Sequence, residues 1–138
     1  GEVEGTTLNV PFPPGATHTD FLAAFDEVIG PAIVDFDPDL LFVSAGFDAH
    51  EHDPISRMRV STEGYGLLTE RVRDLADNTD AGLAFALEGG YGLDTLSESI
   101  RMVHEVFDGY TPVRDEDDSP SDSALDVIAD VRARGFEY

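Results

Sequence analysis

Two short apolar runs, each followed by a turn of small residues, constrain the fold of this chain most strongly. Leu40–Ser44 leads into Gly46 and Asp48, and Leu83–Leu87 leads into a Gly-Gly pair and Tyr91. Runs of this length and character are typical of buried strands. Because segments with helical periodicity alternate with them, we predict an α/β fold in which helices cover both faces of a parallel sheet. The carboxyl ends of the strands would then carry the functional loops.

The segment before the first run predicts a strand and a helix. Thr7–Val10 suits a short strand that ends at a proline-rich loop. The helix that follows has Thr17 or Thr19 as its N-cap, is kinked at Pro31 and ends near Asp37.

Two more helices are predicted from capping residues and apolar spacing. The first of them is capped by Ser61 or Thr62 and lies between the two strands. The second opens with a capping box of Thr95 and Glu98 and ends at Gly109.

The length of the chain allows one compact domain or part of a larger one, since it has 138 residues. It begins with Gly1, without a start methionine or a signal-type apolar run, so we expect a fragment. Thr111–Asp122 is rich in Pro, Asp and Ser and predicts a flexible acidic linker before a short helix. We therefore expect two regions, residues 1–110 and 111–138. No run approaches the roughly 20 apolar residues of a membrane span, so no membrane association is predicted.

Acidic residues dominate the charge of the chain. It has eight Arg, no Lys and 29 Asp plus Glu, and 8 − 29 gives a net charge of −21. Molar salt shortens the Debye length to about 3 Å and screens repulsion among these carboxylates. We interpret the composition as adaptation to a salt-rich cytoplasm. An acidic surface for basic partners is the alternative, but the acids are spread along the chain. Binding to nucleic acid is disfavoured.

Asp48 is the first candidate for chemistry. A carboxylate directly after a buried strand is costly to desolvate unless a cation or hydrogen-bond donors compensate it. An Asx-type turn or a helix cap is the alternative interpretation. His50 and His52 could extend Asp48 into a metal site, although solvated loop histidines are the more common case. Because the chain has no cysteine, any metal would be bound by Asp, Glu or His.

Tyr91 is the second candidate. Gly89 and Gly90 before it allow positive φ and a close backbone approach. The loop lacks the lysine of a P-loop and the spacing of a dinucleotide motif, so it is a poor phosphate site. The Tyr91 phenol would be either a core group tied to a carbonyl or a donor to an oxyanion at a metal-polarised carbonyl.

Several ordered motifs resemble a known family. They are Ser44-Ala45-Gly46-Phe47-Asp48-Ala49, Asp53-Pro54, Thr62-Glu63-Gly64-Tyr65 and Leu87-Glu88-Gly89-Gly90-Tyr91. Their spacing resembles the carboxyl-terminal half of the histone deacetylase superfamily, over about residues 5–107. That superfamily includes class II-type deacetylases, acetylpolyamine amidohydrolases and acetoin utilisation proteins.

The resemblance implies an arginase/deacetylase-like fold and zinc-dependent hydrolysis of an acetylated amine such as acetyl-lysine, with K⁺ as a possible structural cation. Asp48 would be a Zn²⁺ ligand, and Tyr91 would donate a hydrogen bond to the substrate carbonyl and then to the tetrahedral oxyanion. The substrate channel and active-site loops would include Gly46, Phe47, Ile55, Gly89 and Gly90.

The resemblance also sets limits on function. The other two zinc ligands of the family, in an Asp-x-His motif, and its His-His pair lie upstream of the matching region, so we expect this chain alone to be inactive. The apolar Ile55 would not attract a second ammonium and weakly disfavours a polyamine preference. A non-catalytic remnant or an acidic interaction module is the main alternative. A binuclear manganese ureohydrolase would need an Asp-x-Asp pair, which Asp48-Ala49-His50 does not supply. No oligomeric state is indicated.

Overall fold

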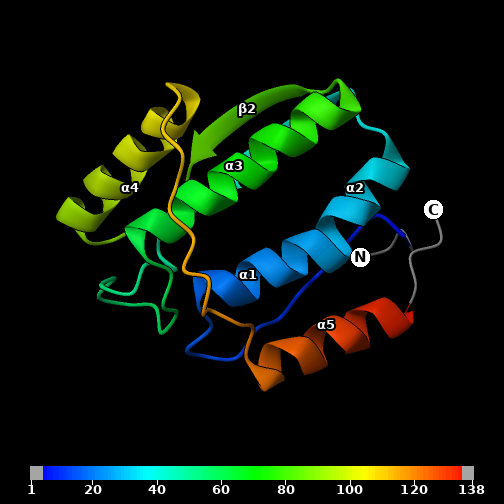
Figure 1. Cartoon of the computed structure of the whole chain (residues 1–138), viewed down its shortest axis with the longest axis horizontal. Helices are drawn as coiled ribbons and strands as arrows, with labels where there is room; N and C mark the ends of the chain where they lie inside the picture. Colours follow the sequence, from blue (N-terminus) through cyan, green and yellow to red (C-terminus); the bar gives the residue numbers. More distant parts are fainter. Residues whose placement is uncertain (1–4, 135–138) are drawn as a thin grey trace.

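The computed structural model describes residues 5–134 and contains a two-stranded parallel sheet packed against helices (Figure 1). Strand β1 (Leu40–Ala45) pairs with β2 (Gly82–Leu87), with Leu40 opposite Gly82 and Ala45 opposite Leu87. The crossover between them contains helix α3 (Thr62–Thr79). A crossover is what two parallel strands require, because a tight turn cannot join them. The predicted α/β arrangement with a parallel sheet is confirmed, and both strands end within a residue of the predicted bounds.

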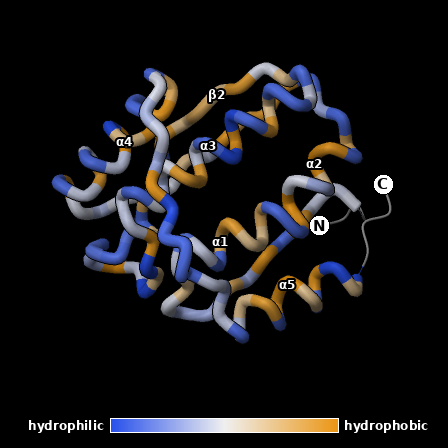
Figure 2. The backbone as a smooth tube through the Cα atoms, in the orientation of Figure 1, coloured by the Kyte–Doolittle hydropathy of each residue, from blue (hydrophilic) through white to orange (hydrophobic). Residues whose placement is uncertain are grey.

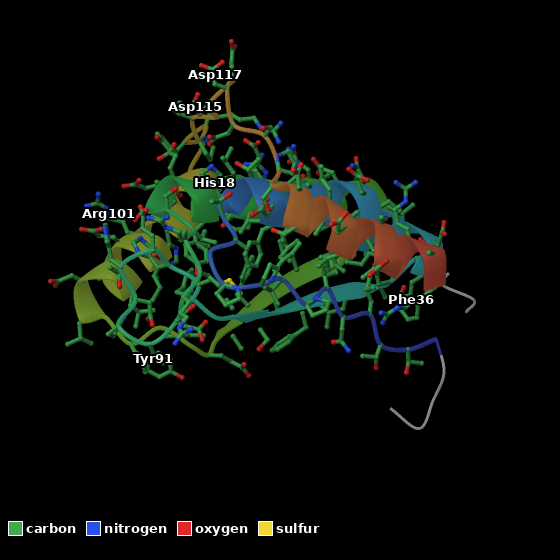
Figure 3. All side chains as sticks on the ribbon, turned by 90° about the horizontal axis from the view of Figure 1, so that it is seen from below. His18, Phe36, Tyr91, Arg101, Asp115 and Asp117 are labelled. Carbon is green, nitrogen blue, oxygen red and sulfur yellow. The ribbon has the colours of Figure 1, made fainter. Side chains whose placement is uncertain are left out.

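Among the described residues, only one face of this sheet is covered, contrary to the expectation of helices on both faces. Helices α3 and α4 (Leu93–Phe107) pack on the face that carries Ala45, and Figure 3 shows the helices on one side of the strands. Leu40 and Phe42 belong to the other face and are 56% and 64% exposed. Parallel sheets are normally buried on both faces. The sheet in residues 5–134 is therefore part of a larger layered arrangement, as expected for a partial arginase/deacetylase fold.

The first predicted helix is interrupted just before Pro31. It consists of α1 (His18–Ala24), a π-helical turn (Phe25–Ile29) and α2 (Gly30–Phe36). Thr17 is the N-cap, as predicted. Pro31 has no N–H to donate to the carbonyl four residues earlier, so the regular ladder cannot run through it. The structure shows this interruption as a π-helical turn that ends just before α2, and a bend at Pro31 itself stays a prediction.

The predicted start of α4 is wrong. The helix begins at Leu93, with Gly92 as the N-cap, two residues before the capping box expected from Thr95 and Glu98. The Thr95 hydroxyl instead donates to the Gly92 carbonyl oxygen at 2.9 Å, inside the first turn. A threonine in a helix can satisfy its hydroxyl on a preceding carbonyl in this way, so its presence does not by itself mark the helix end.

The strand predicted at Thr7–Val10 is also wrong. This segment pairs with no strand of the described residues, and it runs extended along the helices. Leu8, Val10 and Phe12 pack against a core cluster formed by α1, the π-helical turn and helix α5 (Asp122–Arg134). Figure 2 shows the apolar part of the N-terminal segment lying between α1 and α5. Apolar packing without ladder partners explains the strand-like sequence.

The chain between α4 and α5 has no regular secondary structure, but side chains of the helices contact it at several points, one of which joins His18 Nε2 to Asp118 Oδ2 at 3.4 Å. Glu63 Oε1 accepts hydrogen bonds from the Tyr110 hydroxyl at 2.9 Å and from the Val113 N–H. Asp20 Oδ1 accepts one from the Ser121 N–H at 2.7 Å. The division of the chain near residue 110 stays a prediction, and residues 1–4 and 135–138 of its two regions lie outside the described residues.

Among residues 5–134, every helix is too short or too polar to span a membrane.

Helices α1 and α3 approach each other closely at Gly64. Ser61 is the N-cap of α3, one of the two residues predicted, and its hydroxyl accepts a hydrogen bond from the Gly64 N–H at 3.0 Å. A Cβ atom at Gly64 would lie 2.5 Å from His18 Cβ and 2.8 Å from His18 Cγ. Cβ is fixed to the α1 backbone, so a side chain at Gly64 would push the two helices apart.

Gly64→Ala is therefore expected to destabilise the protein. Higher helix propensity would contribute about 1 kcal/mol in its favour, whereas overpacking of a close contact costs about 1–3 kcal/mol. We expect the free energy of unfolding, measured in urea, to fall by up to about 2 kcal/mol. Asn78→Ala at an exposed position of the same helix is the control, with an expected change within about 0.5 kcal/mol. Equal stability of both variants would contradict the close helix contact.

Candidate active site at the strand ends

The loops that follow β1 and β2 continue to pair beyond the sheet. The Phe47 N–H donates to the Gly89 carbonyl oxygen at 2.8 Å, and the Glu88 N–H donates to the Ala45 carbonyl oxygen at 3.0 Å. The parallel ladder thus carries both predicted loops to the same edge of the sheet. The structure brings Gly46, Asp48 and Gly89 together at this edge, although Asp48 and Gly89 lie 41 positions apart in the sequence.

The Asp48 carboxylate lies against the backbone of two glycines. A Cβ atom at Gly46 would lie 3.0 Å from Asp48 Oδ1, and one at Gly89 would lie 2.9 Å from both Cγ and Oδ1. The side chain is half-buried. Within residues 5–134 it forms no hydrogen bond or ion pair, so the Asx-turn and helix-cap alternative has no support there. A half-buried carboxylate without such a partner is available as a ligand for a cation.

The other predicted loop residues divide between the core and the surface. The Phe47 side chain is buried, and its ring centroid lies 5.0 Å from that of Tyr65. Ile55 is 67% exposed. Gly90 has a φ of +129°, and a Cβ atom there would lie 2.8 Å from Leu96 Cδ1, so both the backbone conformation and the space require glycine. Their roles in a substrate channel stay predictions.

Tyr91 lies on the surface at the carboxyl end of β2. It is 58% exposed, and Figure 3 shows it at the opposite end of the molecule from Phe36. Its phenol forms no hydrogen bond within the described part of the chain. The backbone of Tyr91 is held, because its N–H donates to Asp53 Oδ2 at 2.9 Å. The phenol is therefore neither buried nor tied to a carbonyl, and it is free to meet a ligand.

The role of Asp53 was not predicted from the sequence, where Asp53-Pro54 is noted only as a family motif. The Asp53 side chain is buried and accepts from three backbone N–H groups, those of Ile55, Ser56 and Tyr91. Burial alone would raise the pKa of this carboxyl, but the three hydrogen bonds together outweigh burial and lower the pKa. Asp-Pro followed by Ser is a local turn signal, whereas the bond to Tyr91 depends on the fold.

His50 is buried, which contradicts the prediction that both loop histidines are solvated. Its Nδ1 accepts from the His52 N–H at 3.1 Å, and its Nε2 lies 2.9 Å from the Thr62 hydroxyl. Burial, followed by nearby His52, lowers the pKa of His50, so the ring is neutral at pH 7 with its proton assigned to Nε2. Both ring nitrogens are occupied, and His50 therefore does not extend Asp48 into a metal site. His52 is exposed, as predicted.

The described residues contain no group of three His, Cys, Asp or Glu side chains that could hold a metal ion. The half-buried Asp48 at the strand ends has the chemistry that Zn²⁺ accepts, a carboxylate without a competing partner within residues 5–134. The residues present thus fit one ligand position of a zinc site, and any further protein ligands would come from outside residues 5–134. Tyr65 borders the same place, and burial together with the nearby Asp48 carboxylate raises the pKa of its phenol.

The fold and these strand-end loops define a segment of a deacetylase domain, and comparisons with known proteins agree. A family model described as histone deacetylase domain matches residues 1–107. The chain is 41% identical to histone deacetylase 10, chloroplastic, of Oryza sativa subsp. japonica over 88% of its own length and 28% of that protein. It is 36% identical to polyamine deacetylase HDAC10 of Homo sapiens over 96% of its length and 20% of that protein.

A solved structure shows the same similarity in three dimensions. The structure of the histone deacetylase Clr3 matches with a TM-score of 0.83 and 34% identity, over 92% of this chain and 21% of that one. The chain belongs to the histone deacetylase family. It spans less than a third of the length of each of these relatives.

Gly89→Ala is expected to disturb the Asp48 carboxylate directly. Gly89 is not among the glycines with positive φ, so the backbone tolerates alanine and the new methyl group would displace the carboxylate. We expect the free energy of unfolding to fall by about 1–3 kcal/mol. In the control, Gly82→Ala, the nearest atom is Leu40 Cδ1 at 3.3 Å, so the neighbour needs to move much less than the Asp48 carboxylate does. A Gly89→Ala protein as stable as the control would show that Asp48 does not pack against this glycine.

Proposed function

We propose that this chain forms the carboxyl-terminal part of a zinc-dependent deacetylase that hydrolyses the acetamide of an acetylated amine, such as acetyl-lysine. Residues 1–110 would belong to the catalytic domain, and residues 111–138 would form an acidic extension. The observation that carries the proposal is the half-buried Asp48 carboxylate, unpaired within residues 5–134, at the edge of the sheet where β2 delivers the exposed Tyr91 phenol. Membership of the histone deacetylase family supports the reaction class.

Each residue of the site would have a distinct task. Asp48 would bind Zn²⁺ through its carboxylate, and the other ligands would come from outside the described residues. When bound, Zn²⁺ would act as a Lewis acid on the acetamide carbonyl. Tyr91 would donate its phenolic proton in a hydrogen bond to the carbonyl oxygen and more strongly to the oxyanion, which lowers the barrier to hydrolysis. This chain alone would then lack activity, because one ligand does not hold the metal.

Substitution of the two residues is expected to have different effects in the full-length protein. Asp48→Ala should abolish zinc retention, because it removes a ligand. Tyr91→Phe should retain zinc but lower kcat by about 10²-fold or more, because it removes an oxyanion donor. Metal analysis and acetyl-lysine hydrolysis measure the two effects. Unchanged zinc content in Asp48→Ala would refute the ligand role, and undiminished turnover in Tyr91→Phe would refute the donor role.

The loop after β1 bears on which class of acetylated amine would be the substrate. Ile55 is apolar and 67% exposed, so it would not attract a second ammonium group. Acetyl-lysine is therefore favoured over an acetylated polyamine, and the ratio of kcat/KM for the two substrates tests this preference.

A folded full-length protein without zinc or activity would favour the second candidate, a non-catalytic interaction module, whose support is the net charge of −21.

We also propose that the protein is adapted to a salt-rich cytoplasm. The support is again the charge of −21, which makes the compact state repel itself at low ionic strength. Exposed acids on separate helices, among them Asp77, Asp126 and Asp130, contribute to this repulsion.

The thermal midpoint of unfolding is expected to rise as KCl increases from about 0.1 M to 1 M, where the Debye length falls from about 10 Å to 3 Å. Asp77→Asn, Asp126→Asn and Asp130→Asn combined should raise the midpoint at low salt and reduce its dependence on KCl. A midpoint that does not depend on KCl, or that depends on it equally in the variant, would contradict electrostatic self-repulsion.

A further inference from the structure

One buried carboxylate joins the loops that follow the two strands. Asp53 Oδ1 accepts from the Ile55 and Ser56 N–H groups at 2.9 and 3.0 Å, which closes a turn within its own loop. Asp53 Oδ2 accepts from the Tyr91 N–H at 2.9 Å, across 38 positions of sequence. The two oxygens therefore have separate partners, one local and one in the loop that carries the proposed donor.

The Tyr91 loop has little else to fix it. The Gly89 carbonyl oxygen is held by Phe47, and the Gly92 carbonyl oxygen belongs to the first turn of α4. Between these two oxygens, the bond from Tyr91 to Asp53 is the one hydrogen bond in the described part of the chain. Gly89 and Gly90 are flexible residues without side chains to pack, and the Tyr91 side chain is 58% exposed.

We propose that Asp53 is a positioning residue, whose carboxylate holds the Tyr91 backbone so that the phenol meets the substrate carbonyl. This inference rests on the proposed function of Tyr91. A hydrogen-bond donor acts on an oxyanion only within a narrow range of distance, and a displacement of about 1 Å can cost about 10²-fold in rate. A charged acceptor forms a stronger bond to an N–H group than a neutral one does, which suits the part of the loop between the Gly89 and Gly92 carbonyl oxygens, where no other hydrogen bond is made in the described part of the chain.

Asp53→Asn separates the two local hydrogen bonds of the carboxylate from the remote one, with almost no change in shape. The amide oxygen can still accept from Ile55 and Ser56, which preserves two hydrogen bonds. The amide nitrogen then faces the Tyr91 N–H, and two donors cannot bond to each other. If the amide group were rotated so that its oxygen faced the Tyr91 N–H, the two hydrogen bonds from Ile55 and Ser56 would be lost and only one kept. The substitution therefore removes the link to Tyr91 while the turn after Asp53 remains closed.

Asp20 provides a matched control. It is a buried aspartate that accepts from a local N–H, that of Thr17 at 3.0 Å, and from a remote one, that of Ser121 at 2.7 Å. It lies at the start of α1, and its hydrogen bonds within the described residues are with Thr17 and Ser121, not with Asp48, Asp53 or Tyr91. Asp20→Asn should shift the urea midpoint of unfolding about as much as Asp53→Asn, since both lose one charge-assisted bond. It should leave kcat unchanged.

The test measures kinetics and amide exchange in the full-length protein. We expect Asp53→Asn to lower kcat for acetyl-lysine hydrolysis by about 10- to 100-fold, with a KM within about twofold and unchanged zinc content. Combined with Tyr91→Phe, it should cause no further loss, because a positioning residue has no effect once the phenolic hydroxyl is absent. The proposal would be overturned if Asp53→Asn lowered kcat by the same factor in the Tyr91→Phe background as in the wild type. It would also be overturned if kcat in Asp53→Asn were undiminished.

Hydrogen exchange separates failure of this proposal from failure of the proposed function. The Tyr91 amide should exchange faster in Asp53→Asn than in wild type, and at the wild-type rate in Asp20→Asn. If the wild-type protein does not hydrolyse acetyl-lysine, the proposed function fails, whereas faster exchange would still support Asp53 as the group that holds this loop. Unchanged exchange at Tyr91 in Asp53→Asn would overturn the positioning role whether or not the protein is active.

Discussion

Parallel pairing of β1 with β2 is the interaction on which the rest of the structure depends. Because both strands run in the same direction, the loops after them meet at one edge, and the ladder extends one step further through Phe47 and Glu88. This pairing brings Asp48 against Gly89 and allows Asp53 to reach Tyr91. An antiparallel pair would have placed these groups at opposite ends of the sheet.

The parts of the fold that local chemistry determines could be predicted from the sequence. Apolar runs located both strands, Thr17 and Ser61 marked helix starts, and Pro31 marked the break before α2. The strand-end position of Asp48 followed from the same pattern, since a turn of small residues after a buried run determines where the next side chain lies.

The parts that depend on tertiary contacts could not be predicted in this way. Thr7–Val10 has the composition of a strand but packs on α1 and α5 without a ladder partner. His50 has the sequence context of a loop histidine, yet Thr62 and the His52 N–H form hydrogen bonds with its two ring nitrogens. These bonds offset the free-energy cost of burying the ring. The link from Asp53 to Tyr91 crosses between two loops, and no spacing along the chain encodes it.

The contact between Asp20 and Ser121 has a consequence for the order of folding. The two residues lie 101 positions apart, and the cluster of Ala24, Val28, Ile128 and Val131 joins the same ends of the described chain. Closing so long a loop is entropically costly, and contacts of this separation form slowly. On the ribosome, α1 must therefore wait for α5 to emerge. Until then Ala24 and Val28 lack their partners Ile128 and Val131, and a helix synthesised much later completes this cluster.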